Sequence, residues 1–266
     1  MVAFGEALPK IRKQVERDLS LTGLPREKVL ASVVKLMTIT FIRVGNPEYA
    51  RTNNSFGLTT LRDHHVEVSG SRLQFKFRGK GGKEHAIQVT DLRLARIVKR
   101  CQDIPGYELF QYLDENGQRR KIDSSDVNEY LRRISGHDFT AKDFRTWAGT
   151  VLALSALKEA GLSDSARQAK KNIVEAIKVV ADQLGNTPAI CRKCYVHPIV
   201  LESYSNGWLL EKLEVLSTRS RSSSNGLEAD EVPVLAFLKD AQAAEAVPLE
   251  DKLRKSLKQA RKKKAS

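Results

Sequence analysis

Five side chains combine the types needed to bind an anion and react with it: Arg43, Lys80, Arg145, Asn186 and Tyr195. Arginine offers a planar fork of N–H donors that can hold two oxygens of one anion, and lysine adds a compact positive charge. An amide donates hydrogen bonds without carrying charge, and a phenol can act as a nucleophile. All five stand at predicted ends of helices and strands, where distant parts of a chain can converge.

Taken singly, each of these side chains also has an ordinary structural explanation. Arg43 could complement a helix C-terminus, Lys80 could be a solvated hairpin tip, and Tyr195 could be a half-buried core residue. A functional interpretation therefore depends on their combination and their order along the chain.

Motifs for metals and nucleotide cofactors are weak or missing. Cys191, Cys194 and His197 offer at most three closely spaced ligands, and no second pair stands at zinc-finger distance. The CxxC pair does not follow a βαβ strand, so a redox dithiol is equally weak. P-loop, HExxH and GxGxxG motifs are absent, and residues 79–83 lack the Walker spacing. The sequence thus predicts neither metal nor cofactor, and it argues against an ATP-driven enzyme.

The chain is basic, with 266 residues, 45 Lys and Arg against 32 Asp and Glu, and a formal net charge of +13. A hydrophobic fraction of 41% excludes disordered and collagen-like classes. The charge indicates a polyanionic partner, with nucleic acid favoured over an acidic membrane surface. No segment is apolar enough to span a membrane, and Glu6 stands where a signal peptide would be apolar, so a cytoplasmic location is predicted.

The elements that must position the five side chains are mostly helices. Residues 26–44 show the apolar spacing of an amphipathic helix, and Gly45 ends it. From residue 64 the apolar period changes to two, which predicts two hairpins with Lys80 in the glycine-rich tip 79–83. Further helices are expected at 91–102, after 123, from 140, up to Gly185 and after Thr187. The predicted fold class is mainly α with a small three-stranded antiparallel sheet (α+β).

The sequence also predicts three parts along the chain. Residues 1–216 form the body, and the serine-rich segment 217–231 is expected to be a flexible linker. Residues 232–266 are expected to form short helices followed by a basic tail, because 252–266 holds eight Lys and Arg and no acid. Such a tail is typical of a solvated electrostatic arm.

Four short segments carry the first four side chains in a fixed order: FIRVGN (41–46), FRGK (77–80), KDFRTW (142–147) and LGNTP (184–188). Tyr195 follows nine residues after Asn186. This ordered set resembles the type IB DNA topoisomerases, especially the small bacterial and poxvirus-like enzymes, over about residues 2–216. The combination is specific, although no single motif in it is.

The resemblance implies the catalytic fold shared by these topoisomerases and the tyrosine recombinases, and it gives each residue a role. Tyr195 would be the nucleophile that becomes joined to a 3′ phosphate, and Lys80 the general acid for the departing 5′ oxygen. Arg43, Arg145 and Asn186 would stabilise charge on the phosphoryl oxygens, although many relatives have histidine at the last position. The implied activity is ATP- and metal-independent relaxation of supercoiled DNA by transient single-strand cleavage and religation.

Five further residues are predicted to contact double-stranded DNA: Lys142, Tyr49, Lys76, Arg78 and Lys83. Lys142 precedes Arg145 by three residues and shares roughly its helix face. Tyr49 resembles a DNA-facing position of the family, with a packing role nearly as plausible. The alternate basic residues of the strand could contact the DNA backbone or form an ordinary solvated face.

Members of the resembled family have a β-rich N-terminal domain before this region, whereas this sequence starts directly at the catalytic part. The resemblance therefore implies a monomeric, nucleoid-associated clamp of which one half is missing. Two rivals stay open: a tyrosine recombinase, whose chemistry overlaps, and a non-catalytic DNA-binding protein, for which the basic tail would suffice. Lys142, where recombinases usually have histidine, favours the topoisomerase.

Overall fold

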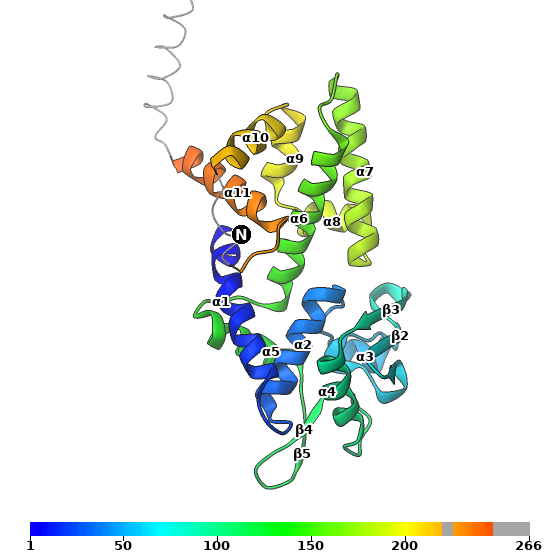
Figure 1. Cartoon of the computed structure of the whole chain (residues 1–266). Helices are drawn as coiled ribbons and strands as arrows, with labels where there is room; N and C mark the ends of the chain where they lie inside the picture. The colour runs from blue at the N-terminus through cyan, green and yellow to red at the C-terminus, as the bar shows by residue number, and fades with distance from the viewer. Residues whose placement is uncertain (220–225, 247–266) are drawn as a thin grey trace, which may run out of the picture.

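The computed structural model describes residues 1–219 and 226–246, and its helices fall into two groups (Figure 1). The lower group in Figure 1 contains α1 (Val2–Leu19), α2 (Arg26–Thr40), α4 (Leu92–Gln102) and α5 (Ser124–Ser135). The upper group contains α6 (Ala141–Ala160), α7 (Ala166–Leu184), α8 (Pro188–Cys194), α9 (Pro198–Ser205), α10 (Leu209–Arg219) and α11 (Glu231–Ala246). Helix α6 joins the groups, because it contacts α1, α2 and α5 below and packs along α7 above.

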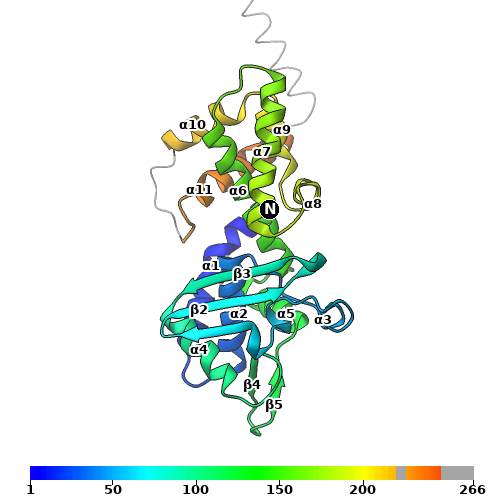
Figure 2. The same cartoon turned by 90° about the vertical axis from the view of Figure 1, so that its right-hand side faces the viewer.

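A three-stranded antiparallel sheet covers one side of the lower group (Figure 2). Its strands run in the order β1 (Val66–Ser69), β2 (Arg72–Arg78) and β3 (Glu84–Thr90). Alternate side chains of β2 are buried, and the others are largely solvent-facing, as the period of two predicts. The predicted class, mainly α with a three-stranded antiparallel sheet, is confirmed.

Helix α1, helix α3 and a second hairpin, all in the lower group, are missing from the sequence-based prediction. Helix α3 (Pro47–Asn53) begins after Asn46, whose side chain accepts hydrogen bonds from the N–H groups of Glu48 (2.8 Å) and Tyr49 (3.2 Å). A second, two-stranded hairpin consists of β4 (Gln111–Leu113) and β5 (Arg119–Lys121) and projects from the bottom of the molecule in both views.

The end of α2 differs from the prediction, which continued this helix to residue 44. The helix ends at Thr40 because Phe41 adopts a left-handed conformation (φ 56°). Arg43 therefore lies on an extended segment, where its carbonyl accepts the N–H of Leu58 at 2.9 Å. Gly57 makes this pairing possible, since a methyl group there would lie 2.5 Å from the Arg43 carbonyl oxygen.

Helix α11 packs on α1, α6 and α10, beyond the predicted body. At its start the buried carboxylate of Glu231 accepts two hydrogen bonds from Arg12 (2.7 and 2.9 Å) and one from the Trp147 indole (2.9 Å). The division of the chain at residue 216 stays a prediction, and the basic tail 252–266 lies outside the described residues. None of the described helices is long and apolar enough to cross a membrane.

Candidate active site

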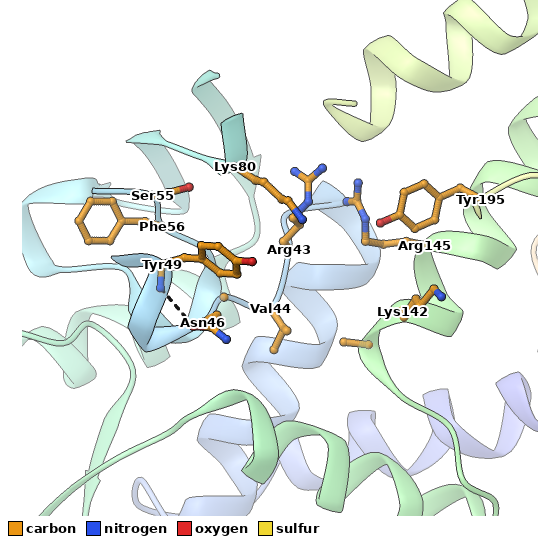
Figure 3. A pocket seen from close by; sticks show the side chains of 12 residues that line it. Arg43, Val44, Asn46, Tyr49, Ser55, Phe56, Lys80, Lys142, Arg145 and Tyr195 are labelled. Atoms are coloured by element: carbon orange, nitrogen blue, oxygen red, sulfur yellow. Dashed lines mark hydrogen bonds between the residues drawn. The ribbon is translucent and has the colours of Figure 1, made fainter. Parts of the chain in front are cut away.

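A pocket opens where α2, α3, the β2–β3 turn, α6 and the end of α8 meet (Figure 3). Six of the ten predicted site residues line it: Arg43, Tyr49, Lys80, Lys142, Arg145 and Tyr195. The other lining residues are Val44, Gly45, Asn46, Ser55, Phe56 and Ala141, so the lining holds four cationic side chains and no carboxylate. Such a set favours an anionic ligand, because nothing within the lining neutralises the four positive charges.

Arg145 lies at the centre of the site and is buried. Its guanidinium donates to the carbonyl of Phe41 and, at 2.7 Å, to the carbonyl of Leu184. These carbonyls stand just before the segments that carry Arg43 and Asn186. Arg145 therefore joins the end of α2 to the end of α7, and it does so with the same fork of donors that the sequence assigned to phosphate oxygens.

Arg43 completes this connection from the α2 side. Its guanidinium donates to the side-chain oxygen of Asn186 and lies 3.5 Å from the carbonyl oxygen of Gly185. The structure thus brings Asn186 to the site, although this residue does not line the pocket itself. Its amide is oriented by Arg43, which leaves the Nδ2 group to donate elsewhere.

Two N–H donors at this site have no partner. Among the described residues, only Asp63 Oδ1, Arg145 Nε and Asn186 Nδ2 are buried side-chain polar atoms without a hydrogen bond. A buried donor without an acceptor costs about 1–3 kcal/mol, so orphaned donors in native structures call for an explanation. Arg145 Nε and Asn186 Nδ2 both lie beside the cationic pocket, and an anion bound there would supply the missing acceptor.

Tyr195 follows α8 directly, and its N–H donates to the Cys191 carbonyl at 2.9 Å. The ring is half-buried, and its centroid lies 5.1 Å from the guanidinium carbon of Arg145. Figure 3 shows the phenol oxygen pointing into the pocket, toward Arg145 and Arg43. A phenol hydroxyl and two guanidinium groups that can bind an anion therefore lie next to one another in the cavity.

The pKa values of Arg43 and Arg145 are both lowered in this site, where the two positive charges lie close together. Burial lowers the pKa of Arg43, and the neighbouring charge of Arg145 lowers it further. Burial likewise lowers the pKa of Arg145, while the Tyr195 hydroxyl acts in the opposite direction. Two guanidinium groups close together in a partly desolvated site are unfavourable until an anion lies between them.

Lys80 approaches the pocket from the opposite side, in the turn between β2 and β3. Its ammonium nitrogen lies 5.8 Å from the ring centroid of Tyr49, within the range of a cation–π contact. Tyr49 is 51% exposed despite its size, which leaves much of its ring available to a ligand. The position of Tyr49 accordingly supports a role in the site rather than in the core.

The remaining predicted residues lie apart from the pocket. Lys76, Arg78 and Lys83 are exposed on the β2–β3 hairpin, and none of them lines the cavity. Sequence reasoning missed Ser55 and Phe56, which line the pocket after α3. The Asn46-Pro47 cap signal would have revealed α3, but no local pattern reveals which side chains behind it face the cavity.

No group of three or more His, Cys, Asp or Glu in residues 1–219 and 226–246 is arranged to hold a metal ion. Of the CxxC pair, Cys191 is buried under the site and Cys194 is exposed.

Comparisons with known proteins show the family. The family described as eukaryotic DNA topoisomerase I, catalytic core, matches residues 1–215. The chain is 31% identical to the DNA topoisomerase 1B of Acanthamoeba polyphaga mimivirus over 214 residues, which cover 76% of this chain and 62% of that protein. It is 25% identical to the DNA topoisomerase 1B of Vaccinia virus (strain Copenhagen), over 73% of this chain and 60% of that protein.

Among solved structures, a XerH site-specific recombinase bound to difH substrate aligns with a TM-score of 0.45 and 14% identity, covering 72% of this chain and 49% of that chain. The chain spans about three fifths of the length of the viral relatives. The family match covers most of the chain and includes every residue of the pocket. The chain therefore belongs to the DNA topoisomerase I family, within the catalytic core.

Proposed function

We propose that this chain is a type IB topoisomerase that relaxes supercoiled double-stranded DNA by cutting and resealing one strand. The observation that supports this most is the convergence of Tyr195 with a buried arginine (Arg145), a half-buried arginine (Arg43) and an orphaned amide donor in a pocket without carboxylates. A phosphodiester in this pocket would be held by the arginines while the phenol lies within reach of phosphorus.

In the cleavage step the Tyr195 hydroxyl gives its proton to water, and its oxygen forms a bond to phosphorus. The bond from phosphorus to the 5′ oxygen breaks, and that oxygen takes a proton from the Lys80 ammonium. Arg43, Arg145 and the free N–H of Asn186 stabilise the charge that develops on the non-bridging oxygens. The product is a 3′-phosphotyrosine and a free 5′-hydroxyl.

Religation is the reverse of this step, with the 5′-hydroxyl as the attacking group. The free strand rotates before it is resealed, and the strain of supercoiled DNA drives the rotation. The phosphotyrosine keeps the energy of the broken ester, so the reaction needs neither ATP nor a metal ion. We further propose that a monomer carries out this activity in the cytoplasm, at nucleoid DNA, and acts as a clamp on the duplex.

DNA contact beyond the pocket would come from Lys142 and Tyr49 at its rim and from Lys76, Arg78 and Lys83 on the hairpin. Each cation that neutralises a phosphate steepens the dependence of log affinity on log salt by about 0.9. Each alanine variant of a hairpin residue is expected to weaken DNA binding and to lower this salt dependence by about one phosphate contact. The rate of cleavage at saturating protein should stay unchanged.

The test is relaxation of a negatively supercoiled plasmid in EDTA without ATP, comparing the wild type with Tyr195→Phe. Relaxation by the wild type alone supports the proposal. DNA binding without relaxation and without a covalent adduct would instead indicate a non-catalytic binding protein. Exchange of strands between two duplexes would indicate a recombinase.

A further inference from the structure

His85 is a conspicuous residue near the site that the proposed chemistry does not use. It is the second residue of β3 and pairs with Phe77 of β2. The two rings are stacked, with centroids 4.9 Å apart and an interplanar angle of 13°. His85 is not among the residues that line the pocket, so its ring acts on the structure around the pocket rather than on a ligand in it.

The His85 ring is wedged between two glycines. A methyl group added at Gly79 would lie 2.5 Å from Nε2 of His85, and one added at Gly185 would lie 2.9 Å from Cε1. Gly79 directly precedes Lys80, and Gly185 directly precedes Asn186. One ring therefore contacts the segment of the general-acid candidate and the segment of an anion-binding amide (Figures 1 and 2 show the hairpin tip beneath the end of α7).

These two segments are held in different ways. The end of α7 is fixed by Arg145 at the Leu184 carbonyl and by Arg43 at Asn186. The hairpin tip, by contrast, contains three glycines within four residues, and Lys80 is exposed. Two hydrogen bonds close the tip, from the Gly79 N–H to the Lys83 carbonyl (2.7 Å) and from the Gly82 N–H to the Gly79 carbonyl (3.1 Å), but neither joins it to α7. Because glycine also allows many backbone conformations, packing has to set the position of the tip relative to α7. The His85 ring supplies such packing, because it contacts both Gly79 of the tip and Gly185 at the fixed end of α7.

The charge state of His85 is consistent with a packing role. Burial lowers its pKa, and the charges of Arg43, Lys83 and Arg145 lower it further, against a smaller opposing effect of Glu84. The imidazole is therefore neutral at pH 7 and adds no positive charge to a site that already crowds two guanidinium groups.

We propose that His85 is a positioning residue, which holds the Lys80 tip against the end of α7 so that the Lys80 ammonium meets the departing 5′ oxygen. This inference rests on the proposed function. It predicts that loss of the ring impairs protonation of the leaving group, whereas binding of DNA and attack by Tyr195 survive.

A change of leaving group tests this directly. Two duplexes that differ in one bridging atom at the cleaved phosphodiester, oxygen or sulfur at the 5′ position, are cleaved in a single turnover. In both, the bond from Tyr195 to phosphorus forms as the bond to the bridging atom breaks. An oxygen must receive a proton from Lys80, but sulfur can leave as a thiolate because a thiol has a pKa of about 8.5.

His85→Ala is expected to cleave the oxygen substrate at least about tenfold more slowly than the wild type, as misplaced general acids commonly do. With the sulfur substrate its rate should return to within about threefold of the wild type, and Lys80→Ala should show the same pattern. Equal slowing on both substrates, or no slowing with oxygen, would overturn the proposal. Gln88→Ala, at an exposed position of the same strand, is the matched control.

A second variant tests the contact itself. Gly79 has an ordinary backbone conformation (φ −98°), so Gly79→Ala is excluded only by the His85 ring. Introduced alone, Gly79→Ala should slow cleavage of the oxygen substrate. Added to a chain that already carries His85→Ala, it should slow cleavage little further, and additive effects of the two changes would contradict the contact. If the wild type forms no adduct with either duplex, the proposed function itself is contradicted. If the wild type forms the adduct but the His85 variants do not behave as described, only the role of His85 is contradicted.

Discussion

Gly149 on α6 lies directly against the main chain of Tyr195. A methyl group at position 149 would stand 2.4 Å from the Tyr195 carbonyl oxygen and 3.2 Å from its Cβ. Gly149 is one helical turn beyond Arg145, so the same face of α6 supplies a cation to the site and the space that Tyr195 occupies. The absence of a side chain at this position lets Tyr195, the proposed nucleophile, lie close to Arg145.

Gly149→Ala is therefore expected to abolish most cleavage activity. Alanine in a helix interior would ordinarily stabilise the protein by about 1 kcal/mol relative to glycine, but here the methyl group must displace Tyr195. A displacement of about 1 Å at a reacting group can cost on the order of 100-fold in rate. Single-turnover cleavage measures this, with exposed Lys158→Ala on the same helix as the control; an unchanged rate together with a raised melting temperature would contradict the contact.

Arg145→Lys should destabilise the protein as well as inactivate it. A single ammonium cannot take both positions of a guanidinium fork, so the carbonyl of Phe41 or of Leu184 loses its donor. An unsatisfied buried carbonyl costs about 1–3 kcal/mol. Urea unfolding measures the loss against Arg132→Lys, a surface exchange on α5; equal stability of the two variants would show that Arg145 does not tie the two segments together.

Asn186→Asp should impair cleavage more than Asn186→Ala. Both variants lose the free amide N–H, which is worth about 100-fold in rate if it stabilises the phosphoryl oxygens. The aspartate also places a negative charge beside Arg43, where it competes with the phosphate for that arginine. Single-turnover rates at saturating protein would decide this, and an aspartate variant as fast as the wild type would exclude the amide as a donor.

His65 should make the folded state sensitive to mild acid. Burial, followed by the charges of His64 and Arg62, lowers the pKa of His65 to about 4, and its Nδ1 accepts the N–H of Arg62 at 2.9 Å. Between pH 6.5 and 4 the unfolded chain binds a proton at this residue that the folded chain does not. Stability therefore falls as pH falls through this range, by at most about 1.4 kcal/mol per pH unit from this group.

Urea unfolding at pH 7.5, 6 and 5 checks this, with His65→Asn as the comparison. Asparagine keeps an acceptor for the Arg62 N–H but cannot be protonated in this range. The stability of the wild type should fall more steeply with acid than that of the variant. Parallel curves would show that His65 does not account for the acid sensitivity.

Local patterns in the sequence predicted most of the elements that carry the site, with α3 as the exception. The alternation in β2 and the caps at Asp123, Thr140 and Thr187 locate strands and helices close to where the structure has them. The hairpin β4–β5 also has a local signal, an Asn-Gly turn with Gly117 at φ 71°, which the sequence analysis overlooked.

Other features depend on contacts between distant segments, and no local pattern reveals them. The left-handed Phe41, which ends α2 early and puts Arg43 on an extended segment, is unusual for a bulky residue. The use of Arg145 to hold two backbone carbonyls, and the space that Gly149 leaves for Tyr195, follow from how α6 packs against its neighbours. Local patterns therefore suggest candidate reacting groups but not the contacts that orient them.

The central claim is that Tyr195 becomes covalently joined to DNA, and the most direct measurement is the adduct itself. A duplex whose cleaved strand is labelled on its 5′ side, and whose short 3′ fragment can dissociate, is mixed with protein in EDTA and denatured. We expect a labelled protein–DNA adduct with the wild type, linked through Tyr195, and none with Tyr195→Phe. An adduct that persists in Tyr195→Phe, or a label that is retained only when placed on the 3′ fragment, would contradict it.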